Sequence, residues 1–504
     1  MANDLMRIRW VPVVVSAFVV TTLMVGGPTG FGLGGSMAAA SPAGIVSTFA
    51  DPSINQPFGV AAGPDGNLWF TNLNIGTIGR VTPAGVVSHF SGGGIAGPEG
   101  IVAGPDGNRI TSGFVNPADH TGDFTPLTPA RILDTRDGTG GNGGPLGGGA
   151  SFNVQITGRG GVPASGVSAV VLNATVTDPT APGFLTIWPT EFSQPVISNL
   201  NFVPGQTVPN AVTVAVGAGG KVSVFNHAGS TDVVFDVVGY YSNAAGPAGS
   251  RFHGISPARF FDTRDGTGGV QPATPVGQDA TLKFKVTGKQ GVPGSGVTGV
   301  VMNVTVTDPS LPSYVTVYPD DVTRPLASNL NFVAGQTVPN LVVMRVPASG
   351  IVDFYNLTGS THLLADVVGY YDGDKSTEAG RLIPLNPSRL LDTRDFNEPL
   401  LPDDGGSLQV IGYGGVPTSG VGSVVLNVTA TQPTDSGFIT VFPDDACSIP
   451  LASNLNFVAG QTVPNLVMVR VSTLTGCATW AGAVDFYNHS GTTHLIVDVF
   501  GYFT

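Results

Sequence analysis

The sequence predicts an all-β protein with three tandem antiparallel β-sandwich domains, the jelly roll being among the candidate strand orders, preceded by a partial β-propeller-like segment. Two observations support this fold class. Gly (72) and Pro (40) make up more than a fifth of the 504 residues, and both disfavour helix interiors. In addition, one domain-sized repeat occurs three times, and a shorter repeat of different sequence precedes it.

The composition narrows the classes of function. Charged residues make up 11% of the chain and hydrophobic residues 41%, which is enough to build cores and argues against charge-rich disorder. The formal net charge is −13. Because so acidic a chain has little basic surface to hold phosphate backbones, we expect no nucleic-acid partner.

Residues 1–40 are predicted to be a secretory signal peptide. Two arginines among the first nine residues precede the apolar run Val11–Val25, and small residues ending at Ala40 offer a cleavage site. A membrane anchor is the alternative, but the run contains Pro12 and is shorter than the roughly 20 residues needed to span. We therefore expect a secreted, extracellular or cell-envelope protein without a membrane span after cleavage.

Residues 41–120 are predicted to form partial propeller-like blades. The segment Gly63–Asn67 returns 41 positions later as Gly104–Asn108, a spacing typical of propeller blades. With the intervening Asn67–Thr71 and Ile78–Gly85, residues 45–115 resemble blades of the streptogramin (virginiamycin B) lyases.

The resemblance to the lyases covers too few blades to close a ring, since a propeller closes with about four to eight. The catalytic His and Glu of that family lie in later blades and have no matching positions here. We therefore expect no enzymatic activity and assign no catalytic residue. A streptogramin-lyase-like C–O lyase is the enzyme alternative.

The long repeat defines three domains, at residues 125–242, 251–372 and 381–504. Each copy contains about eight short runs rich in Val, Thr and aromatic residues, separated by Gly, Pro, Asn or Asp, a pattern typical of β-sandwiches. Runs that are apolar on both faces, such as Val233–Val238, are predicted to be central strands. Because the linkers between copies are short, we expect separate domains in a row, like beads on a short string, without extensive contacts between them.

Three signatures recur in each copy: Asp-Thr-Arg near the start, Ser-Asn-Leu-Asn-Phe in the middle, and Asp-Val-x-Gly-Tyr near the end. They resemble those of exported tandem β-modules of actinobacteria. The resemblance implies a place outside the cell or in its envelope, but no settled activity. Asn173, Asn303 and Asn427, in Asn-x-Thr sequences within predicted strands, are interpreted as sheet residues and not as glycan acceptors.

The only two cysteines, Cys447 and Cys477, are predicted to form a disulfide. Each lies in a short stretch that the other two copies lack, and oxidation is expected in an exported protein. Two buried free thiols are the alternative.

One ion pair per domain is predicted from aspartates that lie inside apolar runs, where a carboxylate needs a partner. Arginine is a natural bidentate partner for a carboxylate. The predicted pairs are Arg136 with Asp236, Arg264 with Asp366, and Arg394 with Asp498.

A ligand site is the alternative use of these polar residues. Asp134, Asn199, Asn201 and Asp236 offer oxygen atoms that suit Ca²⁺ or sugar hydroxyls. For the two asparagines, capping of backbone groups in an ordered loop is the competing interpretation. We expect no cofactor and no metal site, with calcium as the alternative.

Trp188, Tyr318 and Phe442 occupy equivalent positions before a proline and are candidates for ligand contact by stacking on sugars. Core packing is the alternative, and burial distinguishes the two. The sequence favours a non-enzymatic repeat protein with a structural, adhesive or glycan- or protein-binding role. Its expected partner is an envelope polysaccharide or another surface protein, and an inert surface stalk is a further alternative.

Overall fold

The computed structural model describes residues 8–10, 57–62, 67–72, 77–82, 86–90, 100–103, 109–112, 120–376, 379–473, 477–478 and 480–504. The chain forms two compact units, one containing β1 (Ile8–Trp10) and His120–Thr504, the other Val15–Asp119. Over the described residues the structure consists of strands and one short 3₁₀ turn, Ala218–Gly220, so the all-β prediction is confirmed. No helix in this part of the chain is long and apolar enough to cross a bilayer.

The first sandwich consists of two four-stranded antiparallel sheets, in the orders β14-β11-β16-β8 and β10-β15-β12-β13. Numbered along the chain, these eight main strands read 6-3-8-1 and 2-7-4-5, which is the double Greek key of a jelly roll. The short β9 pairs with the start of β16. The strands are β8 (Phe124–Asp134), β9 (Leu146–Gly147), β10 (Ser151–Gln155), β11 (Val167–Thr177), β12 (Gly183–Pro189), β13 (Leu200–Phe202), β14 (Val208–Ala215), β15 (Lys221–Asn226) and β16 (Ser230–Ser242).

The second and third sandwiches repeat this order, as β17-β24-β19-β22 with β18-β23-β20-β21, and β25-β32-β27-β30 with β26-β31-β28-β29. β1 pairs in parallel with the edge strand β26. The second contains β17 (Arg251–Asp262), β18 (Ala280–Lys285), β19 (Val297–Thr307), β20 (Ser313–Pro319), β21 (Leu330–Phe332), β22 (Val338–Arg345), β23 (Ile351–Asn356) and β24 (His362–Asp372). The third contains β25 (Leu382–Asp392), β26 (Asp404–Gln409), β27 (Ser423–Thr431), β28 (Gly437–Pro443), β29 (Leu455–Phe457), β30 (Val463–Arg470), β31 (Ala483–Asn488) and β32 (His494–Phe503).

One sheet of each sandwich is covered on both faces. Along β11, Val170 and Leu172 belong to the core between the two sheets of the first sandwich. The alternate residues Ala169 and Val171 face the opposite way and belong to a fourth core, shared by all three sandwiches. This shared core consists of Phe124, Ala169, Val171, Ile197, Ala211, Val238, Tyr241, Phe252, Val301, Leu341, Val343, Val368, Tyr371, Leu382, Val425, Leu466, Met468, Phe500 and Phe503.

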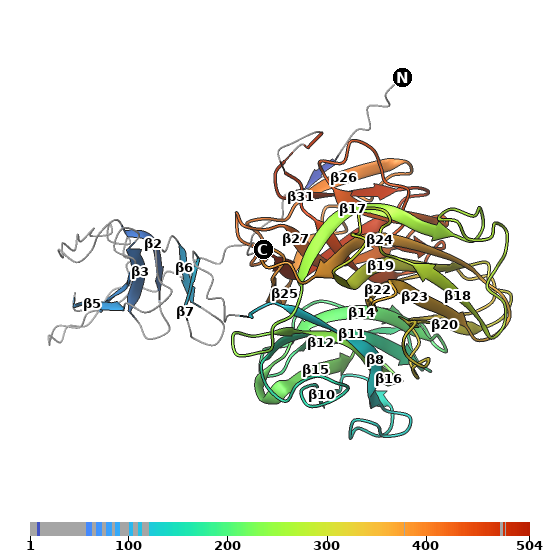
Figure 1. Cartoon of the computed structure of the whole chain (residues 1–504), viewed down its shortest axis with the longest axis horizontal. Helices are drawn as coiled ribbons and strands as arrows, with labels where there is room; N and C mark the ends of the chain where they lie inside the picture. The colour runs from blue at the N-terminus through green and yellow to red at the C-terminus, as the bar shows by residue number, and fades with distance from the viewer. Residues whose placement is uncertain are drawn as a thin grey trace, which may run out of the picture. The chain divides into compact units, whose positions relative to one another are not determined.

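The expected beads on a string are therefore wrong, because the three sandwiches group around a common centre (Figure 1). Burying the second apolar face of each sheet removes apolar surface from water, at about 25 cal/mol per Å². Separated beads would leave these faces exposed as large apolar patches. Strands that are apolar on both faces were predicted to be central in their sheet. Their second apolar face also specifies the interface with the other sandwiches.

Six buried asparagines join the sandwiches in a closed cycle. Asn173 donates to the carbonyl of Ser328, at 2.7 Å, and its side-chain oxygen accepts from Asn340 at 2.8 Å. The oxygen of Asn340 accepts from the backbone N–H of Ala211 at 3.1 Å. The same three hydrogen bonds join the second sandwich to the third and the third to the first. A head-to-tail contact that repeats and closes in this way forms a ring with pseudo-threefold symmetry.

A second set of contacts between the sandwiches lies at the start of the first strand of each one, β8, β17 and β25. Phe124 donates its backbone N–H to Ser250, Phe252 to Gly380, and Leu382 to Gly122. Beside them the buried Asp123 accepts from Arg251 at 2.6 Å and from Lys375 at 2.8 Å. These contacts join residues of different sandwiches, so the linkers are part of the packed ring.

The N-terminal unit contains a four-stranded antiparallel meander and a separate hairpin. The meander consists of β2 (Pro57–Ala62), β3 (Leu68–Asn72), β4 (Thr77–Val81) and β5 (Val87–Phe90), and the hairpin of β6 (Gly100–Ala103) and β7 (Arg109–Ser112). Phe70 packs over Gly79, where an added Cβ would lie 2.0 Å from the ring. The arrangement agrees with the predicted partial propeller-like segment. The predicted signal peptide, apart from β1, lies outside the described residues.

The predicted disulfide between Cys447 and Cys477 is confirmed. It closes a loop with a sequence separation of 30. In the chain-entropy account such a loop contributes about 3 to 4 kcal/mol by restricting the unfolded chain. We expect Cys447→Ser/Cys477→Ser to lower the free energy of unfolding by up to that amount in calorimetry. Unfolding of the wild type that is unaffected by reductant would contradict this.

Candidate functional site

The recurring aspartates are paired with arginines, but not with the predicted ones. Arg131, on β8, donates to Asp236 from Nε at 2.6 Å and from Nη2 at 3.2 Å. Arg136 instead binds Asp134, two residues before it, at 2.7 Å. The other two sandwiches repeat this, with Arg259–Asp366 and Arg264–Asp262 in the second, and Arg389–Asp498 and Arg394–Asp392 in the third. The predicted partnership of Arg136, Arg264 and Arg394 with Asp236, Asp366 and Asp498 is therefore wrong.

Strand register explains the different partners. β8 pairs with β16, and in this register Arg131 lies directly opposite Asp236. Arg136 lies in the turn after β8 ends at Asp134, so its guanidinium folds back onto that nearby carboxylate. The correct partner could have been considered from the sequence, because the arginine of the Pro-x-Arg stretch before each Asp-Thr-Arg also recurs in all three copies.

Each cluster combines two arginines with two aspartates whose pKa values shift in opposite directions. Burial raises the pKa of Asp236 and Asp366, and raises that of Asp498 to about 6, although an arginine beside each favours the charged form. Hydrogen bonds from Arg136 lower the pKa of Asp134. With both carboxylates ionised, the charges of a cluster balance.

The residues considered for calcium have other partners. Both oxygens of Asp134 accept from Arg136, and Asp236 is held by Arg131. The side-chain oxygen of Asn199 accepts from the backbone N–H of Ile187 at 2.7 Å. Asn199 therefore caps a backbone group, as the competing interpretation expected. Asn201 accepts from Ser198 at 3.1 Å. Within the described residues, no three His, Cys, Asp or Glu side chains converge as metal ligands would.

Trp188, Tyr318 and Phe442 are buried, with exposed fractions of 6%, 8% and 3%. Such burial does not fit a sugar-stacking platform, so these residues are core side chains. Trp188 satisfies its indole N–H with the carbonyl of Phe192, at 3.0 Å. Each of the three aromatic residues is the last but one of its strand, β12, β20 or β28, and precedes the proline that ends the strand.

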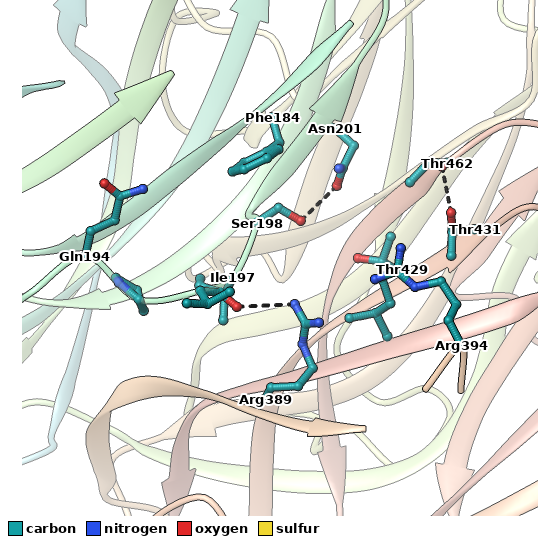
Figure 2. A pocket seen from close by; sticks show the side chains of 13 residues that line it. Phe184, Gln194, Ile197, Ser198, Asn201, Arg389, Arg394, Thr429, Thr431 and Thr462 are labelled. Carbon is teal, nitrogen blue, oxygen red and sulfur yellow. Dashed lines mark hydrogen bonds between the residues drawn. The ribbon is translucent and has the colours of Figure 1, made fainter. Parts of the chain in front are cut away.

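A cleft of about 610 Å³ lies between the first and third sandwiches, and neither pattern nor spacing predicted it. Its two walls come from segments more than 180 residues apart (Figure 2). The first sandwich contributes Phe184, Gln194, Pro195, Val196, Ile197, Ser198 and Asn201. The third contributes Arg389, Arg394, Thr429, Thr431, Thr462 and Ile496.

Two contacts of the ring hold the walls of this cleft together. Arg389 donates to the carbonyl of Val196 at 3.4 Å, and Asn427 donates to that of Ser198 at 2.8 Å. The equivalent contacts at the next interface run from Arg131 to Leu326 and from Asn173 to Ser328. The loop that forms the first wall is thus anchored by its backbone. Its exposed side chains, Gln194 and Val196, face the cleft or solvent, whereas Ile197 also packs into the shared core.

Comparison with known proteins adds little to this description. No family model and no curated protein sequence matches the chain. A solved structure titled "The Triple Jelly Roll Fold and Turret Assembly in an Archaeal Virus" is 9% identical, covers 76% of this chain and 90% of its own, and has a TM-score of 0.17. One from Sulfolobus Turreted Icosahedral Virus has 9% identity, coverages of 76% and 91%, and a TM-score of 0.16. The CBM22-1-CBM22-2 tandem domain of Paenibacillus barcinonensis Xyn10C has 10% identity, coverages of 48% and 98%, and a TM-score of 0.15. Similarity at this level carries no argument about function.

Proposed function

We propose that this chain is a secreted or cell-envelope-associated, non-enzymatic protein whose ring of jelly rolls binds an envelope polysaccharide or another surface protein at several points. One observation carries the proposal. Val196, Leu326 and Leu451, at equivalent positions of the three copies, are 91%, 83% and 76% exposed. A single exposed aliphatic side chain is ordinary, but the same exposure three times on one rigid ring favours a contact surface.

Multivalent binding follows from the rigidity of the ring. The asparagine cycle and the shared core hold the three loops at constant separations. A polymer or a regular surface would therefore engage more than one loop at once, and linked weak contacts can raise avidity by two or more orders of magnitude. Three sandwiches closed into a ring present their loops on one body, which favours the binding role over the inert stalk alternative.

The non-enzymatic part of the proposal is supported by how the recurring polar residues are used. The aspartates and arginines present in every copy pair with one another, and the asparagines join the sandwiches. Because these recurring side chains make structural contacts with one another, they support a non-enzymatic role.

Retention on insoluble cell wall and on a panel of polysaccharides, with and without EDTA, tests the proposal on the full secreted chain. We expect saturable retention, weakened at least tenfold in Val196→Ser/Leu326→Ser/Leu451→Ser. The matched control is Val203→Ser/Val333→Ser/Val458→Ser, which changes another equivalent set that is 54% to 57% exposed and should bind normally. Absence of retention on every matrix would exclude the polysaccharide partner and leave only a surface protein as the proposed partner. Loss of retention in EDTA alone would revive the calcium alternative.

A further inference from the structure

We infer that the cleft between the first and third sandwiches binds a neutral oligosaccharide. The inference deepens the proposed function, on which it rests, by assigning a site and a class of ligand. The cleft volume of about 610 Å³ lies within the roughly 300–1,000 Å³ typical of ligand sites. Because one wall belongs to each sandwich, the site exists only when the ring has closed.

A buried hydroxyl without a hydrogen-bond partner lines the cleft, and the hydroxyls of the equivalent Thr175 and Thr305 in the other sandwiches lack a partner as well. Thr429 is 1% exposed, it lines the cleft, and its hydroxyl has no hydrogen-bond partner in the structure. Buried polar groups are almost always paired, so one that lines a cleft calls for a ligand hydroxyl or water. Thr429 belongs to the wall from the third sandwich, as do Arg389 and Arg394 (Figure 2).

Further hydrogen-bonding groups surround this hydroxyl. Among the described residues, the amide of Gln194 and the amide nitrogen of Asn201 have no partner, although the oxygen of Asn201 accepts from Ser198. Arg394 is 43% exposed and uses Nε and Nη2 on Asp392, so Nη1 remains to donate. Such a mixture of amide, hydroxyl and guanidinium groups suits a ligand with many hydroxyls.

Apolar side chains supply the other half of the recognition. The ring of Phe184 stacks on His227, with centroids 4.5 Å apart, which restrains its orientation beside the cleft. Ile197 and Ile496 line the cleft as well. A sugar ring presents C–H groups on its faces and hydroxyls around its edge, so it matches a site in which apolar and hydrogen-bonding groups alternate.

The charge balance favours a neutral sugar. Arg389 and Arg394 are compensated by Asp498 and Asp392, so the cleft wall has no net charge while both carboxylates are ionised. The chain as a whole has a formal charge of −13, which repels an acidic sugar at long range.

The three interfaces differ at several positions that line this cleft, and Gln194 is one of them. Gln194 is replaced in the second copy by Arg324, whose guanidinium lies 3.7 Å from the centroid of Tyr355, and in the third by Ile449. The amide, which can both donate to and accept from hydroxyls, therefore belongs to the cleft between the first and third sandwiches.

Titration calorimetry with the full chain tests the inference. The probes are cellohexaose, xylohexaose, maltohexaose and, as the acidic comparison, trigalacturonic acid. We expect at least one neutral probe to bind and the acidic one not to. Thr429→Val, which keeps the shape and removes the unpaired hydroxyl, should weaken binding at least tenfold, and so should Gln194→Ala.

The matched control is Thr305→Val, since Thr305 is an equally buried, unpartnered threonine at the equivalent position of the second sandwich. It should bind the probe normally. Unchanged binding by Thr429→Val and Gln194→Ala, binding of the acidic probe alone, or no binding of any probe would each overturn the inference. Normal retention on insoluble polysaccharide alongside any of these results would show that the proposed adhesion survives and only the cleft assignment fails.

Discussion

Replacing Asn340 with alanine is expected to lower the free energy of unfolding by about 4–6 kcal/mol, since three hydrogen bonds are lost and buried groups stay unpaired. Asn340 is completely buried. Its amide nitrogen donates to Asn173 at 2.8 Å and to the carbonyl of Asn329 at 2.6 Å, and its oxygen accepts from Ala211 at 3.1 Å. Denaturant unfolding followed by circular dichroism measures the loss.

The control is Asn331→Ala in the same sandwich. Asn331 is partly exposed and donates one hydrogen bond, to Ser328 at 3.1 Å, so its removal should cost about 1 kcal/mol or less. Small-angle scattering on Asn340→Ala adds an independent measurement, because a weakened interface should enlarge the average radius of gyration. Equal stability of the two variants would show that the asparagine cycle does not hold the ring.

Arg259→Met is expected to lower the free energy of unfolding by about 3–5 kcal/mol, since it leaves a buried carboxylate without its counter-charge. Asp366 is 1% exposed, and Arg259 is the arginine that binds it. Methionine keeps much of the apolar stem of arginine, so the variant removes mainly the charge and its hydrogen bonds. Thermal and denaturant unfolding measure the effect.

Arg264→Met distinguishes the observed pairing from the predicted one. Arg264 has a side chain that is 47% exposed and binds Asp262, which keeps Arg259 as a second partner, so its loss should cost about 1 kcal/mol or less. The reverse order of the two losses would restore the predicted pairing.

The loss in Arg259→Met should also depend on pH. Burial already raises the pKa of Asp366, and removing the arginine raises it further. A group with a raised pKa in the folded state adds stability as the pH falls through that pKa, because the folded protein takes up a proton. The deficit of Arg259→Met should therefore shrink as the pH falls from neutrality through the raised pKa of Asp366, whereas a constant deficit would mean that lost packing dominates.

The repeats made much of the fold predictable from the sequence alone. Alternating apolar residues and Gly, Pro or Asn breaks indicated the strands, because strand periodicity is a local property of the chain. The cysteines, confined to two short stretches of the third copy, indicated their own disulfide. The aspartates inside apolar runs were correctly expected to need arginines, because an unpaired buried carboxylate is costly wherever it lies.

The identities of the partners depended on register, which local pattern does not specify. Asp236 lies 105 residues from Arg131 and 100 from Arg136, so separation along the chain could not choose between them. Pairing of β8 with β16 decided it by placing Arg131 opposite the carboxylate. The aromatic residues before proline likewise had two interpretations, and only burial in the folded domain selected the core.

By itself the sequence determined an all-β chain of three sandwiches behind a partial blade-like segment, the positions of central strands and the need for buried ion pairs. Only the tertiary structure decided that the sandwiches close into a ring, that Asn173 and Asn340 lock its interfaces, and that a cleft forms between the first and third sandwiches. The physical reason is that the sequence shows which apolar faces must be buried and which amide groups must be paired. Which surface buries them depends on how distant parts of the chain meet in three dimensions.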